Sequence, residues 1–101
     1  MKMIKWKEQA FHELNTKELY EISRVRSEVF VVEQEILYND FDRKDYKAIH
    51  LSGYKKEELV AYARIFDKGD YYEDHPGFGR VLVTEKERGK GVGKDLVKMC
   101  I

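Results

Sequence analysis

The residues with the clearest chemical potential form a glycine-rich turn near the end of the printed sequence. The stretch Arg88-Gly89-Lys90-Gly91-Val92-Gly93 follows an apolar segment and precedes a segment with helical periodicity. Glycines at a helix start let several backbone N–H groups point at one place, and those groups lack partners within the helix. The helix dipole and the basic side chains of Arg88, Lys90 and Lys94 also attract anions. The turn therefore predicts a site for a phosphate, and best of all a pyrophosphate.

Two common phosphate-binding motifs do not fit this turn. A Walker A loop requires glycine where the chain has Arg88, and serine or threonine where it has Asp95. A dinucleotide-binding fingerprint that starts at Gly89 requires a third glycine where the chain has Lys94, and a preceding β-α-β crossover that the pattern lacks. The spacing Arg-x-x-Gly-x-Gly, by contrast, is satisfied in full within residues 88–93.

A second group of chemically competent side chains is acidic. Asp40, Asp42 and Asp45 lie close together in a polar segment, which raises the question of a cation site. The segment lacks the glycine and the terminal glutamate of a calcium-binding loop. We therefore expect a solvated loop and no metal.

Three isolated residues complete the set of candidates. His50 alternates with Ile49 and Leu51 along an expected strand, so a cleft is one environment open to it. A lone histidine in a strand is more often a surface residue or a satisfied core residue. Arg64, within the next strand, is expected to be structural. Cys100 has no base in any motif relation to it and lies on an apolar helix face, so it is not expected to be a nucleophile.

Hydrophobic periodicity gives the elements that position the turn. Asn15 and Glu18 have the spacing of a capping box and predict a helix that ends near residue 30 or 31. Strands are expected at 3–6, 48–54, 59–66 and 78–84, with a charged hairpin turn at 55–58 and a last helix after Gly91. The predicted order is β-α-β-β-β-α, an α+β fold. The expected apolar face of the first helix consists of Leu19, Ile22, Val25, Val29 and Phe30.

Composition bounds the class of protein. A chain of 101 residues with 43% hydrophobic and 38% charged residues predicts a single soluble domain over 1–101. The net charge of zero gives no argument for nucleic acid or for an anionic membrane. No apolar run approaches the roughly 20 residues of a membrane helix, and the first residues do not resemble a signal peptide. A lone cysteine excludes an internal disulfide and favours a reducing cytoplasm.

The arginine–glycine spacing after a strand resembles motif A of the GNAT superfamily of acyl-CoA N-acyltransferases. The element order also matches the N-terminal part of that fold, a mostly antiparallel sheet. Residues 26–34, 58–65 and 79–83 resemble the ElaA-type branch of the superfamily. The resemblance implies transfer of an acetyl group from acetyl-CoA directly to an amine, with no metal.

The resemblance also implies which residues hold the cofactor. The amides of residues 89–94 would bind the pyrophosphate of CoA, and the backbone of residues 81–83 would pair with its pantetheine arm. The implied cofactor residues are Val81, Leu82, Val83, Arg88, Gly89, Lys90, Gly91, Val92, Gly93 and Lys94. On the acceptor side, Glu33 and Gln34 are either substrate-binding residues or a solvated pair at a helix end. The acceptor is a small-molecule or peptide amine, and no catalytic residue is assigned.

The last residues of the sequence raise a second hypothesis. Met99-Cys100-Ile101 ends a helical pattern with apolar residues and without a capping glycine. We therefore expect a truncated domain that lacks the C-terminal third of the fold. Such a chain is either an acetyltransferase or a non-catalytic CoA-binding half-domain that self-associates as a homodimer through an exposed strand edge.

Overall fold

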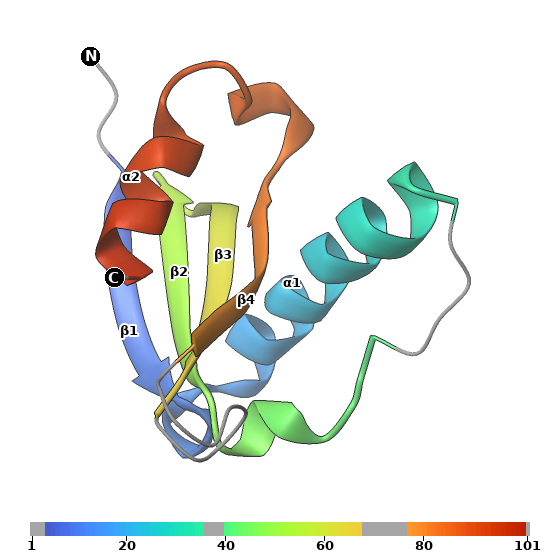
Figure 1. Cartoon of the computed structure of the whole chain (residues 1–101), viewed down its shortest axis with the longest axis vertical. Coiled ribbons are helices and arrows are strands. Elements are labelled where there is room, and N and C mark those ends of the chain that lie inside the picture. The colour runs from blue at the N-terminus through green and yellow to red at the C-terminus, as the bar shows by residue number, and fades with distance from the viewer. Residues whose placement is uncertain (1–3, 36–39, 68–76, 101) are drawn as a thin grey trace.

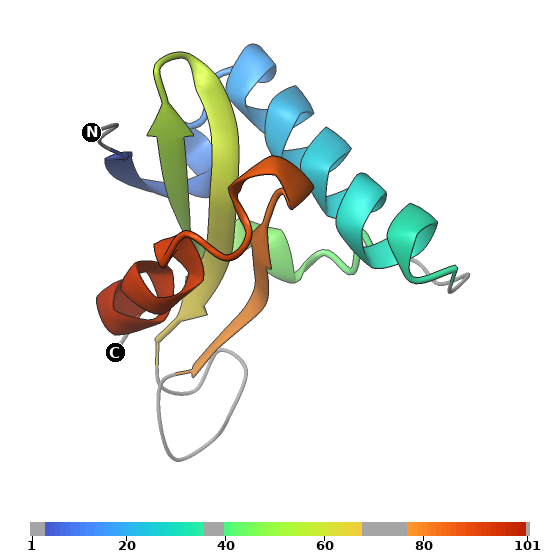
Figure 2. The ribbon, with the colours of Figure 1, turned by 90° about the horizontal axis from the view of Figure 1, so that it is seen from above.

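The computed structural model describes residues 4–35, 40–67 and 77–100 of the chain. Its centre is an antiparallel sheet with the order β1-β2-β3-β4. Helix α1 covers one face of the sheet and helix α2 the other (Figures 1 and 2). The strands are β1 Lys5–Ala10, β2 Ile49–Lys55, β3 Glu58–Phe66 and β4 Gly77–Val83, and the helices are α1 Thr16–Ser27 and α2 Val92–Cys100. The predicted α+β class and element order are confirmed.

Helix α1 begins where the capping box predicts. The side chain of Asn15 accepts a hydrogen bond of 2.7 Å from the backbone N–H of Glu18, and the Glu18 carboxylate accepts one of 3.0 Å from the N–H of Asn15. The helix does not end at residue 30 or 31, as predicted, but continues as a π-helix over Glu28–Glu33. Because π-helical turns are rare and recur at functional sites, this extension draws attention to its last residue, Glu33.

Apolar side chains fill both faces of the sheet. The core beneath α1 is made by residues from α1, the π-helix and the strands β3 and β4, and the second core lies beneath α2. Burial of these side chains is the main source of stability for a domain of this size. The buried members are Ile22, Val25, Val29, Leu59, Tyr62 and Leu82 on the α1 face, and Leu51, Ala61, Ala63, Val92 and Leu96 on the α2 face.

The first strand differs most from its predicted position. It was expected at 3–6 and lies at Lys5–Ala10, where three of its six residues are polar and exposed. Because β1 pairs with β2 and with no other strand of the described residues, it can carry polar residues that an apolar periodicity does not detect. The other strands begin and end within one residue of their predicted bounds. The predicted loop at 67–77 lies largely outside the described residues.

A close contact joins the first two strands. Gly53 of β2 lies opposite Trp6 of β1 in the register, and a Cβ atom on Gly53 would lie 2.6 Å from Cζ3 of Trp6. The indole ring therefore occupies the space that any larger residue would need.

Within the described ranges, neither helix is long and apolar enough to cross a membrane.

Candidate functional site

The glycine-rich turn connects the end of β4 to the start of α2. A 3-10 turn at Glu85–Glu87 leads into it, and α2 begins at Val92. Gly89 and Gly91 adopt left-handed backbone angles, with φ of 82° and 85°. Apart from the chain neighbours of each glycine, no described atom lies within 4 Å of the position where a Cβ would stand on Gly89 or Gly91. The turn therefore places exposed backbone amides at the N-terminus of a helix, which is the geometry of an anion site.

The basic side chains of the turn, Arg88, Lys90 and Lys94, differ in the contacts that they make. Lys94 is exposed, and the Nζ of Lys90 lies 3.7 Å from the carboxylate of Glu87. Arg88 extends toward β4, where its Nε donates a hydrogen bond of 2.8 Å to the carbonyl oxygen of Val83. Its Nη2 donates another, also of 2.8 Å, to the carboxylate of Glu33. The guanidinium thus links the end of β4 to the π-helix.

The pairing of β4 shows which of its amides face outward. The N–H of Thr84 donates to the carbonyl of Val60 in β3, and Leu82 lies opposite Tyr62 in the same register. Because antiparallel strands alternate inward and outward backbone groups, Leu82 directs its N–H and C=O to β3. The backbone groups of Val81 and Val83 therefore face the opposite edge, where the structure describes no further strand. The side chain of Leu82 is buried on the α1 face.

A β-bulge in β4 includes Val81 and the residue before it, Arg80. Tyr62 pairs with Leu82 and Arg64 with Gly79, so two residues of β4, Arg80 and Val81, face one residue of β3. Arg80 has a φ of 51°, which is unusual for a residue other than glycine. Bulges of this kind re-aim a strand and often lie beside active sites.

The acidic segment is not a solvated loop, and that prediction was wrong. Asp40 is 5% exposed and Asp45 is 8% exposed. The three carboxylates bind arginines of α1, β3 and β4, because buried charges require partners of opposite sign. Among the residues described, no group of acidic, histidine or cysteine side chains could hold a metal ion. The ion pairs are Arg26 with Asp40 and Asp45, Arg64 with Asp42 and Asp45, and Arg80 with Asp40 and Asp42.

His50 is a buried core residue, one of the two environments predicted to be more common than a cleft. Its Nε2 lies 3.0 Å from the carbonyl oxygen of Asp45, which can only accept, so Nε2 carries the proton. Its Nδ1 then accepts the hydrogen bond of the Tyr62 hydroxyl. Burial lowers the pKa of His50 and raises that of Tyr62, so both groups stay neutral near pH 7.

Burial also raises the pKa of the Cys100 thiol, which makes this residue a poor nucleophile.

The acceptor-side candidates lie at the end of the π-helix. Glu33 is the last residue of that element and Gln34, which follows it, is exposed. The structure therefore brings Glu33 to the arginine of the glycine turn, which no sequence motif indicated. Sequence reasoning also missed the buried Arg26, although its spacing of four residues from Ile22 and three from Val29 placed it near the apolar helix face.

Comparisons with known proteins agree with this arrangement. The sequence model of the Acetyltransferase (GNAT) family matches residues 8–101. Protein ElaA of Escherichia coli (strain K12) is 42% identical over 101 residues, which cover 98% of this chain and 65% of ElaA. The chain thus spans about two thirds of the length of this relative.

Solved structures show the same fold. The crystal structure of Escherichia coli ElaA superimposes with a TM-score of 0.88 at 41% identity, over 96% of this chain and 66% of that one. An acyl-CoA N-acyltransferase from Pseudomonas aeruginosa gives a TM-score of 0.90 at 33% identity, over 96% and 67% of the two chains. A predicted acetyltransferase from Clostridium acetobutylicum, solved with acetyl-CoA, shares the fold alone, with a TM-score of 0.66 at 13% identity over 97% and 71%.

The described sheet and helices correspond to the N-terminal part of these longer structures, as the sequence predicted. The resemblance to ElaA is likewise confirmed. The chain therefore belongs to the acetyltransferase (GNAT) family.

Proposed function

We propose that this chain binds acetyl-CoA at the glycine turn and along the outer edge of β4, and that it transfers the acetyl group to an amine. The observation that carries the proposal is the turn itself. Left-handed glycines at 89 and 91 lie between an edge strand and the N-terminus of α2. Family membership supports the same reaction class.

The two parts of the site suit the two parts of the cofactor. The pyrophosphate carries negative charge and needs several donors at one place, which the amides of residues 89–94 offer together with Lys90 and Lys94. The pantetheine arm contains amide groups that can pair with the outward backbone of Val81 and Val83, as an added strand does. Leu82, whose side chain is buried and whose backbone groups face β3, would contribute to the site only by packing. Val92, whose side chain is also buried, would contribute only through its backbone or by packing.

The reaction requires a neutral amine. Its nitrogen forms a bond to the acetyl carbon while the bond from that carbon to the CoA sulfur breaks. A base takes the proton of the amine, and the thiolate of CoA accepts a proton as it leaves. A backbone N–H on the outer edge of β4 would polarise the thioester oxygen. No described residue is assigned as the base or the acid.

The acceptor is a small-molecule or peptide amine whose identity is open. Glu33 and Gln34 are our candidates for the acceptor side, because they end the π-helix and Glu33 already contacts Arg88 beside the end of β4. A carboxylate there suits an ammonium group.

A thermal melt tests the binding step. Acetyl-CoA at a concentration a hundred times its dissociation constant should stabilise the folded chain by about 2.7 kcal/mol. Adenosine, which lacks the phosphates, is the control and should leave the melting temperature unchanged. A melting temperature that acetyl-CoA does not raise contradicts the proposal.

Self-association is a second candidate, because β4 ends the described sheet and its outer edge could pair with another chain. It predicts a homodimer that CoA dissociates by competing for the same edge. Sedimentation with and without CoA tests it, and a monomer in both conditions well above micromolar concentration would exclude it.

A further inference from the structure

The backbone of Arg80 is held in a conformation that arginine seldom adopts. Its φ of 51° occurs within β4 at the bulge, one residue before the outward-facing amides. Side chains other than glycine are strained in this region of backbone space, and such strain persists only where the surroundings enforce it. The neighbours of Arg80 must therefore include a group that fixes it.

That group is Asp40, which is nearly fully buried. The Nε of Arg80 donates a hydrogen bond of 2.7 Å to Oδ1 of Asp40, and Nη2 lies 3.4 Å from the Asp40 carbonyl oxygen. Hydrogen bonds between charged groups are the strongest that side chains make, so the guanidinium has little freedom. The pair joins residues 40 positions apart in the sequence.

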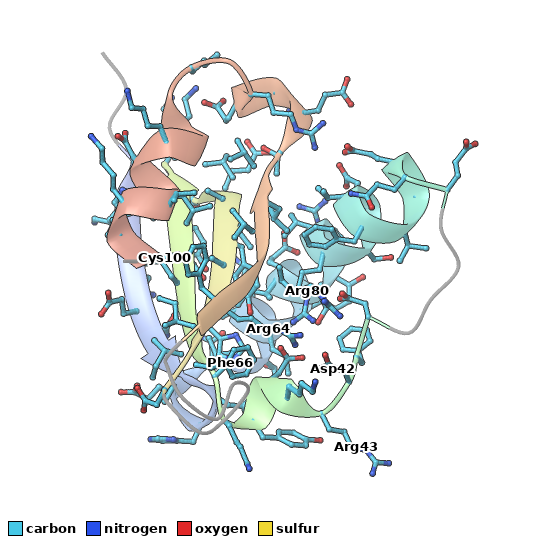
Figure 3. The ribbon with its side chains drawn as sticks, viewed as in Figure 1. Asp42, Arg43, Arg64, Phe66, Arg80 and Cys100 are labelled. Carbon is cyan, nitrogen blue, oxygen red and sulfur yellow. The ribbon has the colours of Figure 1, made fainter. Side chains whose placement is uncertain are left out.

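Asp40 is itself fixed from the other side. Its Oδ2 lies 2.8 Å from Nε of Arg26, whose side chain is only 2% exposed, and its carbonyl oxygen accepts from Nη2 of the same arginine at 3.0 Å. Arg80 and Arg64 also share Asp42, at 3.6 Å and 2.7 Å. Figure 3 shows Arg64, Arg80 and Asp42 directed toward one another between β4 and the 40–46 segment. A network of ion pairs that spans α1, β3 and β4 thus fixes the carboxylate of Asp40, and that carboxylate binds Arg80.

We propose that Arg80 and Asp40 are positioning residues for the pantetheine arm of the cofactor. Their ion pair keeps the bulge of β4 in the one conformation that directs the amides of Val81 and Val83 to the outer edge. The inference rests on the proposed function and adds to it. The arginine–aspartate network on the α1 face sets the backbone conformation of β4, the strand proposed to pair with the cofactor.

A substitution at Arg80 separates this role from a general loss of stability. Arg80→Gly allows the left-handed φ but removes the tie to Asp40, so the bulge remains possible and is no longer enforced. Arg43→Gly is the matched control, because Arg43 also has a positive φ, of 69°, but its side chain is exposed and points away from the network (Figure 3).

Two ligands provide the readout. CoA engages both the turn and the strand, whereas 3′-phospho-ADP, the portion of CoA without pantetheine, engages the turn alone. We expect Arg80→Gly to weaken CoA binding about tenfold, since one charge-assisted hydrogen-bonded pair is lost. Binding of 3′-phospho-ADP should stay unchanged, and Arg43→Gly should bind both ligands as the wild type does. Arg80→Lys keeps a cation beside Asp40 and should weaken CoA selectively but less, which provides the same test if the glycine variant does not fold.

Each other result overturns the inference. Wild-type CoA affinity in both Arg80 variants shows that the pair does not position the strand. Equal losses for CoA and 3′-phospho-ADP show that Arg80 acts through the whole fold. If the wild-type chain binds neither ligand, the proposed function fails first and the inference with it.

Discussion

The carboxylate of Glu33 accepts a hydrogen bond of 2.8 Å from Nη2 of Arg88, although the two residues are 55 positions apart. The contact joins the end of the π-helix to the arginine of the glycine turn. Because the same guanidinium also donates to the carbonyl oxygen of Val83, it connects the glycine turn, the end of β4 and the end of the π-helix.

Glu33→Gln should strengthen CoA binding two- to fivefold, roughly the effect of 0.4–1 kcal/mol. The variant removes a negative charge near the pyrophosphate and releases Arg88 toward it. The gain should shrink as salt is added, because the pair is partly exposed. Titration calorimetry at two ionic strengths measures it, with the exposed Glu57→Gln in the β2–β3 turn as control. A weaker affinity in Glu33→Gln would contradict this prediction.

Alanine substitutions at Gly91 and Gly93 are predicted to have different effects on stability. Gly91→Ala places a side chain at a φ of 85° and should cost about 1–2 kcal/mol in the free energy of unfolding, together with most of the CoA affinity. Gly93→Ala is the control, because Gly93 lies within α2 and its added Cβ would make an ordinary contact of 3.5 Å with Cγ2 of Val83 in β4. Alanine is the better helix former, so stability should stay equal or rise by up to about 1 kcal/mol. Urea denaturation decides, and equal effects at both positions would refute the assigned turn geometry.

Gly53→Ala should destabilise the chain by about 1–3 kcal/mol, because the added Cβ would overlap the ring of Trp6. The same substitution at Gly79 meets no atom within 4 Å and should change the unfolding free energy by less than about 0.5 kcal/mol. Equilibrium unfolding in urea compares the two variants. Equal stabilities would show that β1 and β2 do not pair in the described register.

Stability should fall as the pH drops below about 6.5, the ordinary pKa of histidine. Burial lowers the pKa of His50 in the folded chain, so between the folded and unfolded pKa values the unfolded chain binds more protons. The stabilising contribution of neutral His50 is complete above the unfolded pKa and is lost as the pH falls through the folded pKa. Asp42 does not act in this range, because hydrogen bonds from Arg64 lower its pKa far below the usual value for a carboxyl group. Its contribution is lost only below about pH 4, the unfolded pKa.

Urea titrations at pH 7.5 and 5.5 test the role of His50, with His50→Gln as the comparison. The variant should lose less stability than the wild type between the two values. An identical loss in both proteins would assign the acid sensitivity to other groups.

Local sequence signals predicted the parts of the fold that depend on neighbours along the chain. The capping box of Asn15 and Glu18, the β2–β3 hairpin and the turn that begins α2 all lie where residue type and spacing indicated. In each case the partners are a few residues apart, so the pattern contains the whole interaction. The family followed from the same turn and the strand before it.

The arginine–aspartate network could not be predicted in this way. Asp40 lies 14 positions from Arg26 and 40 positions from Arg80 in the sequence. Nothing in the sequence of residues 40–45 indicates that arginines will bind this segment. A cluster of aspartates is usually solvated, and that expectation failed because three elements converge on it in space. The π-helix was missed for a related reason, since its wide turn has no residue signature and depends on packing against the sheet.

The most direct test of the account is a titration of the ¹⁵N-labelled chain with CoA, followed by the amide signals. The account predicts saturable shifts at residues 89–94 and at Val81 and Val83, with smaller changes at Leu82, whose N–H faces β3. Absence of shifts at the turn and on β4, or shifts confined to other parts of the chain, would contradict it.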